Sequence, residues 1–185
     1  MRTIAAVTNG AGPVNQVRDI LNPRTCLTFF YHEKVSNVVR DMHGHHSGAA
    51  GVVDGAGRFI GLVTEREILR RLFQMKPESK EQQRFADEAK AVMDLTAWDV
   101  MIASPDCLVA DLAVEDALDE ITCKGYRYMP VMDNKDPDKK LVGIVSEREL
   151  FMHVQEKNRR KMQAKDSLLS YFMHHESYGG GAVVM

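Results

Sequence analysis

The sequence predicts an α/β (α+β) protein made of two copies of one β-α-β-β-α unit, followed by a C-terminal helical extension. The first observation is an internal repeat: GLVTEREIL at 61–69 returns as GIVSERELF at 143–151. The second is apolar spacing typical of an amphipathic helix upstream of each copy. Because one unit of about 60 residues covers its sheet poorly, we expect two units packed as a pseudo-symmetric pair.

The elements of each unit follow from short patterns. Residues Val35 to Met42 and Val114 to Ile121 carry the helical spacing. The turn residues Asp54 to Gly57 predict a hairpin in the first unit. A second helix is expected to begin at Thr64 and at Ser146. The expected strands are 26–30, 49–54 and 58–64 in the first unit and 107–110 and 128–133 in the second.

Composition changes divide the chain into five segments. These are a flexible arm at 1–15, a first unit at 16–75, a linker with some helix at 76–96, a second unit at 97–155, and a helix with a glycine-rich tail at 156–185. The last segment carries an apolar patch: Leu168, Leu169, Phe172 and Met173. A patch of this kind needs cover, so we expect it to pack on the body or across a dimer interface.

The overall composition favours a cytoplasmic protein. A net charge of −2 gives no reason to expect a nucleic-acid or membrane partner. Three cysteines without C-x-x-C spacing fit reduced thiols, and no apolar run approaches the roughly 20 residues of a membrane span. There is also no nucleophile–base signature or Walker-type loop, so we do not expect an enzyme.

The repeated motif places a hydroxyl where a strand runs into a helix. A helix N-terminus offers free N–H groups and a positive dipole end, which suit a phosphate. Thr64 or Ser146 could add a donor to it, and Arg66 or Arg148 a cation. The acids three residues after the hydroxyls could accept hydrogen bonds from a ribose diol. These acids are Glu67 and Glu149.

A purely structural interpretation fits the same residues. Thr64-x-x-Glu67 and Ser146-x-x-Glu149 both match the capping box, which begins a helix and needs no ligand. The neighbouring Glu65 and Glu147 favour this interpretation, because a carboxylate there suits the dipole and would repel a phosphate. From the residues alone, both interpretations remain open.

The chain resembles a tandem pair of cystathionine β-synthase-type (CBS) domains. The resemblance rests on the repeated strand–helix motif, on Tyr126-Arg-Tyr-Met-Pro-Val131, and on lead-in sequences Val17-Arg-Asp-Ile-Leu21 and Trp98-Asp-Val-Met101. It covers 16–75 and 97–154, about two-thirds of the chain. It implies a regulatory module in which Thr64 and Ser146 face a phosphate. Glu67 and Glu149 would face the ribose, although the family usually has Asp there.

The resemblance also implies a ligand and partners. The ligand would be an adenosine derivative: AMP, ADP, ATP, NAD(H) or S-adenosylmethionine. No cofactor is required; a homodimer and an unknown regulated protein are implied. The positions matching the base-binding groups of the family are Thr28, Val109, His46, Tyr128, Met129 and Pro130.

Two further patterns favour structural over functional interpretations. His43 and His46 have a spacing usable by a metal, but no cysteine or carboxylate accompanies them, so a surface helix end is favoured. The run Lys157 to Lys161 is basic but contains no aromatic residue, so a solvated helix face is favoured over a nucleic-acid site.

Overall fold

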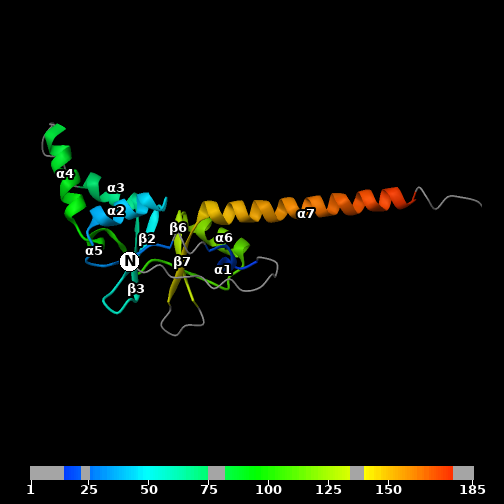
Figure 1. The fold of residues 1–185 in the computed structure, drawn as a ribbon, viewed down its shortest axis with the longest axis horizontal. Coiled ribbons are helices and arrows are strands. Elements are labelled where there is room, and N and C mark those ends of the chain that lie inside the picture. The colour runs from blue at the N-terminus through cyan, green and yellow to red at the C-terminus, as the bar shows by residue number, and fades with distance from the viewer. Residues whose placement is uncertain (1–14, 22–25, 75–81, 134–139, 177–185) are drawn as a thin grey trace, which may run out of the picture.

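A computed structural model of the chain describes residues 15–21, 26–74, 82–133 and 140–176. It confirms the predicted mixed α/β pair, in which two sheets lie side by side with helices at one end (Figure 1). The strands are β1 (Thr28–Phe30), β2 (Ala49–Val53), β3 (Phe59–Thr64), β4 (Ile102–Ala103), β5 (Leu108–Val109), β6 (Tyr128–Met132) and β7 (Leu141–Ser146). The helices are α1 (Val17–Ile20), α2 (Val35–Gly44), α3 (Glu65–Gln74), α4 (Gln82–Asp94), α5 (Ala97–Val100), α6 (Val114–Lys124) and α7 (Glu147–Glu176).

The two sheets repeat one topology. In the first, β1 pairs parallel with β2 and β2 pairs antiparallel with β3; in the second, β5, β6 and β7 pair in the same way. The register is equivalent at the strand starts, where Ala49 lies opposite Thr64 and Tyr128 lies opposite Ser146. The predicted hairpin between β2 and β3 is confirmed: Asp54 accepts hydrogen bonds from the backbone N–H groups of Ala56 and Arg58, each at 2.9 Å.

Each unit has its own core, and a smaller cluster joins the two sheets. In the first core, Val35, Val38 and Met42 of α2 pack on the sheet; in the second, Val114, Ala117 and Ile121 of α6 do the same. These are the positions that the helical spacing predicts to be apolar. Between the sheets lie Ala49, Leu62 and Ile144, with Phe59 and Tyr128 packed against them.

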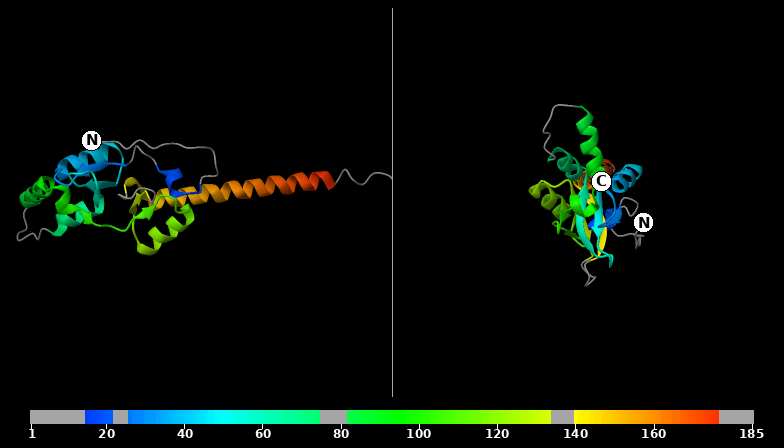
Figure 2. Two further views of the ribbon diagram at one scale, coloured as in Figure 1. Left: turned by 90° about the horizontal axis from the view of Figure 1, so that it is seen from below. Right: turned by 90° about the vertical axis from the view of Figure 1, so that its left-hand side faces the viewer.

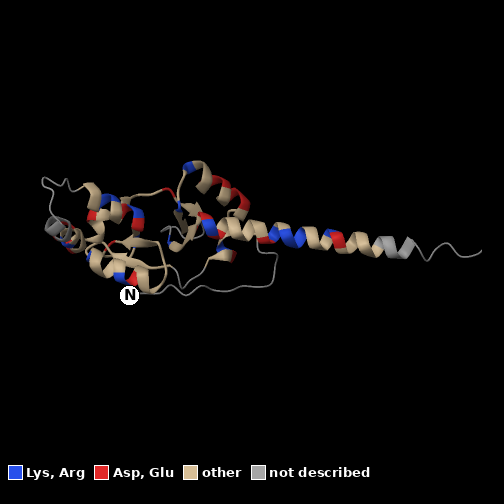
Figure 3. Ribbon diagram, turned by 90° about the horizontal axis from the view of Figure 1, so that it is seen from above, with Lys and Arg blue, Asp and Glu red and all other residues tan. Residues whose placement is uncertain are grey.

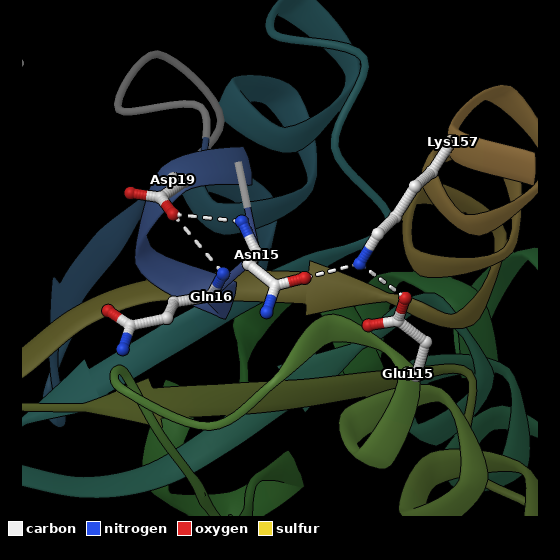
Figure 4. Close-up of polar contacts among 5 residues, drawn as sticks. All are labelled: Asn15, Gln16, Asp19, Glu115 and Lys157. Atoms are coloured by element: carbon white, nitrogen blue, oxygen red, sulfur yellow. Dashed lines mark hydrogen bonds and ion pairs between the residues drawn. The ribbon is translucent and has the colours of Figure 1, made fainter. Parts of the chain in front are cut away.

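The first lead-in segment, residues 15–21, packs on the second unit. Val17 is fully buried in the second core, and its N–H donates to the carbonyl of Leu112 at 2.9 Å. Lys157 of α7 holds this segment from outside, because its Nζ donates to Asn15 and to the Glu115 carboxylate (Figure 4). The segment that precedes the first unit in sequence therefore completes the second.

The second lead-in segment, residues 95–103, packs on the first unit in return. The N–H of Ala97 donates to Glu33 at 2.8 Å, and the N–H of Trp98 donates to Tyr31 at 2.9 Å. Val100 is buried in the first core. β4, at the end of the segment, pairs antiparallel with β3 as the fourth strand of the first sheet. The two units are therefore interlocked through exchanged lead-in segments.

The last helix, α7, extends far beyond the body (Figures 1 and 2). Residues 158–171 are all exposed, with Leu168 at 59% and Leu169 at 51%. Leu168 and Leu169 therefore do not pack on the body, and of the two expected arrangements the dimer interface stays a prediction. The side chains of Phe172 and Met173 lie outside the described part. Basic residues gather along the middle of α7 and acidic ones along α6 (Figure 3). None of the helices in the described ranges is both long and apolar enough to cross a membrane.

Candidate functional site

The repeated motif forms two equivalent strand–helix junctions. Thr64 ends β3 and Ser146 ends β7, and α3 and α7 begin at the next residues. Each junction is closed by the same backbone hydrogen bond: Glu65 N–H to Gly48 at 3.1 Å in the first unit, and Glu147 N–H to Arg127 at 3.0 Å in the second. The sequence therefore specifies the same backbone geometry twice.

The second junction contains a complete capping box. Glu149 accepts hydrogen bonds from the N–H of Ser146 at 2.8 Å and from its hydroxyl at 2.7 Å. The Ser146 oxygen in turn accepts the N–H of Glu149 at 3.1 Å. The hydroxyl proton and the carboxylate, which a phosphate and a ribose would need, are thus bound to each other.

The first junction contains only half of this arrangement. Thr64 Oγ1 accepts the N–H of Glu67 at 3.3 Å, but the Glu67 carboxylate pairs with Arg70 on the next turn of α3. Thr64 is nine-tenths buried, and its hydroxyl proton has no acceptor among the described residues. A hydroxyl has one proton to donate, so this donor remains available to a ligand.

Tyr128 lies where the two units meet. It begins β6 in the second unit, but its ring reaches the first, because a Cβ on Gly48 would lie 2.7 Å from Tyr128 Cζ and closer still to its hydroxyl. Burial raises the pKa of Tyr128, as do the nearby carboxylates of Glu65 and Glu149. The ring therefore lies between the starts of α3 and α7.

The other predicted base-side residues are in different environments. Thr28 is half-buried on β1, and Val109 is 44% exposed on β5. Met129 is fully buried in the second core, so only its main chain can face a ligand. Pro130 is buried in the middle of β6, before β5 begins to pair with that strand. His46 is exposed, with a positive φ of 52°.

The conformation of His46 has a structural explanation. The repeat aligns it with Gly125, which ends α6 with a positive φ of 67°. Both residues end a helix in the left-handed region, where glycine is favoured. His43 and His45 nearby are exposed, and within the described ranges no group of three side chains could hold a metal ion.

Two hollows contain predicted residues. Thr28 lines a cavity of about 850 Å³ together with Phe29, Arg40 and Lys140, a volume in the range of small-molecule sites. Arg148 and Glu149 line a second hollow of about 470 Å³, which also contains Asp19 and Glu156. Of the three carboxylates that line the second hollow with Arg148, Glu156 is paired with Arg159 and Arg160. Arg66 is exposed at the start of α3.

Sequence reasoning missed several residues of these sites. Arg70 diverts the Glu67 carboxylate, and its spacing of three residues on one helix was a usable signal. Gly48 receives the Tyr128 ring, and Lys140 reaches the cavity beside Thr28 from the second unit. Both depend on packing between the units, which local pattern does not show.

Known proteins resemble this chain along most of its length. A family model, the CBS domain, matches residues 17–74 and 97–156. An uncharacterized 17.7 kDa protein of Acidianus ambivalens is 27% identical over 116 residues, which are 63% of this chain. The match spans only 59% of that protein's length.

Solved structures share the fold. A CBS-domain-containing protein from Agrobacterium tumefaciens has a TM-score of 0.59 at 18% identity, covering 79% of this chain and 98% of that one. A CBS domain protein from Pyrobaculum aerophilum, complexed with AMP, has a TM-score of 0.57 at 19% identity, covering 72% of this chain and 88% of that one. With both units matched by the family model, the chain belongs to the CBS-domain family and contains a tandem pair of these domains.

Proposed function

We propose that the chain is a regulatory module that binds an adenosine-containing ligand in the cleft between its two units, at the strand–helix junctions. The observation that carries the proposal is the buried Thr64 hydroxyl at the start of α3, whose proton has no acceptor in the described structure. The helix N-terminus beside it attracts a phosphate. The AMP complex of the Pyrobaculum aerophilum protein supports a ligand of this class.

Regulation by such a module depends on differential binding. A ligand shifts an equilibrium between two arrangements of the units only as far as its affinities for them differ. The exchanged lead-in segments give each unit a direct contact with the other, through which an arrangement can change. The regulated activity would belong to a separate protein that binds the surface of the module.

Thermal unfolding with a panel of nucleotides tests the proposal. AMP, ADP, ATP, NAD(H) and S-adenosylmethionine are compared with guanosine nucleotides. A ligand at 100 times its Kd adds about 2.7 kcal/mol, which raises Tm by roughly 5–10 °C for a chain of this size. A selective rise with one adenosine compound is expected. The absence of any rise at millimolar concentration would overturn the proposal.

A matched pair of variants makes the test specific. Thr64→Val removes the buried hydroxyl and keeps the side-chain shape. Thr122→Val makes the same change at an exposed position on α6. The ligand-induced rise in Tm should disappear in the first variant and persist in the second. Equal loss in both would mean that the effect does not depend on the junction.

The complete capping box at Ser146 favours a second candidate function, a structural module that binds no nucleotide. Replacing Glu67 and Glu149 by Asp separates the two. Asp is the residue usual in the family, so a sensor should keep or gain nucleotide binding. A structural module should lose some capping stability and bind nothing.

We also propose that the module forms a homodimer through its helices. Leu69 and Phe73 of α3 are 53% and 74% exposed, and Phe151 of α7, the repeat equivalent of Leu69, is 49% exposed. Equivalent apolar patches on the two units suit a self-complementary two-fold interface. Sedimentation should give a dimer for the native chain and a monomer for Phe73→Asp. Thr122→Asp serves as the control, and a native monomer would refute the proposal.

A further inference from the structure

The two junctions differ at the strand position opposite the hydroxyl. The backbone around Thr64 and Ser146 is the same, but the residue opposite the hydroxyl is Ala49 in the first unit and Tyr128 in the second. The Tyr128 ring extends from this position toward the first unit. It packs on the cluster between the sheets and reaches Gly48, whose carbonyl accepts the first N–H of α3.

Because the Tyr128 ring extends into the first unit, it forms an aromatic surface beside the Thr64 junction, called the aromatic wall below. The second unit contributes the phenol ring of Tyr128 to the Thr64 junction. At the equivalent position the first unit has Ala49, whose side chain is only a methyl group. A purine can stack on a tyrosine ring but gains little from a methyl group. The Thr64 junction therefore has both a free hydroxyl donor and a stacking surface.

The Ser146 junction lacks the free hydroxyl donor. Its hydroxyl proton and its carboxylate are engaged in the capping box. The hollow beside Glu149 is also lined by Asp19 and by Glu156, which is paired with Arg159 and Arg160. A phosphate and a ribose at Ser146 would have to break the two hydrogen bonds that Glu149 accepts from Ser146.

We infer that the two junctions have separate roles: the chain binds one nucleotide, at Thr64 against Tyr128, and the Ser146 junction serves only to begin α7. This inference rests on the proposed function and states which junction carries it. It predicts one ligand per chain, although the sequence motif occurs twice.

Calorimetric titration of the full chain with AMP, and then with ATP and S-adenosylmethionine, counts the sites. One site per chain is expected. Thr64→Val should weaken binding at least tenfold, and Thr64→Ser, which keeps the hydroxyl, should stay within about threefold. Ser146→Ala should leave Kd within about twofold while lowering Tm, because it removes a helix cap.

A second pair of variants tests the aromatic wall. Tyr128→Leu should weaken nucleotide binding about tenfold, the fold-change expected for lost stacking. Tyr128→Phe keeps the ring and should bind as the native chain does. Circular dichroism of each variant shows whether it is folded before its binding is compared.

The possible failures are distinguishable. Two sites per chain, or binding that is lost in Ser146→Ala and kept in Thr64→Val, would overturn this inference and leave the proposed function standing. No binding of any probe by the folded native chain would overturn both. Native-like affinity in Tyr128→Leu would refute the role of the ring.

Discussion

Gly61 and Gly143 occupy equivalent points of the two units, but their neighbours differ. A Cβ on Gly61 would lie 2.9 Å from the backbone carbonyl of Ile102 and would also meet the Met101 side chain. The three atoms nearest to a Cβ on Gly143 all belong to the Leu21 side chain, the closest at 2.7 Å. Each glycine accommodates the lead-in segment of the other unit. The repeat thus places a glycine on the same strand of each sheet. The lead-in segment that packs on each strand determines how close its atoms come to that glycine.

The largest effects should come from the buried valines of the two lead-in segments. Val17→Ala and Val100→Ala each remove buried methyl groups and should cost about 2 kcal/mol of unfolding free energy. Hydrogen exchange shows where the loss is felt. Val17→Ala should loosen β5 to β7, and Val100→Ala should loosen β1 to β3. The opposite pattern would mean that the segments are not exchanged.

The next largest difference between the units should come from replacing Gly61 and Gly143 by alanine. Gly61→Ala should cost about 1–3 kcal/mol, because the backbone at Ile102 would have to move. Gly143→Ala should cost less, because Leu21 can change its rotamer. Chemical denaturation of the two variants measures both. Equal losses would show that the backbone contact at Gly61 does not matter.

The cap of the second lead-in helix should be sensitive to acid. Asp99 accepts hydrogen bonds from the N–H and hydroxyl of Thr96 at 2.8 and 2.6 Å, and these bonds lower its pKa. A lowered pKa in the folded state stabilises the fold above the unfolded value of about 4, and this contribution is lost as pH falls below it. Asp99→Asn should cost about 1 kcal/mol at pH 7 and little at pH 3.

Asp19 provides the control for this measurement. It caps α1 through longer bonds, 3.3 Å from the N–H of Asn15 and 3.2 Å from that of Gln16. Asp19→Asn should therefore cost less at pH 7 than Asp99→Asn does. A difference between native chain and Asp99→Asn that does not change between pH 7 and pH 3 would contradict an electrostatic origin.

The smallest effect is expected where the second unit departs most from the first. α3 ends at Gln74, whereas α7 continues to Glu176 and is exposed from Asn158 to Tyr171. Removing residues 166–185 should change the unfolding free energy by less than about 0.5 kcal/mol. A clear fall in Tm that depends on protein concentration would instead show that this part of α7 packs against a second copy.

The sequence was sufficient for whatever is local or repeated. The helical spacing located α2 and α6, the Asp54 turn located the β2–β3 hairpin, and the motif located both junctions. The exchange of the lead-in segments was not predictable, because Val17 and Val100 would look equally apolar in either core. The position of the Tyr128 ring was not predictable either, because it depends on a contact with Gly48 in the other unit.

The exchange of lead-in segments also bears on how the chain is made. During synthesis the first sheet cannot gain its fourth strand until Ile102 and Ala103 have left the ribosome. Val17 emerges early but must wait for Leu112 and Val114, whose backbone and core receive it. The N-terminal segment therefore cannot pack in its final place until the whole first unit and the start of the second have been translated. The two units therefore complete their cores late in synthesis, and neither reaches its final packing without a segment next to the other.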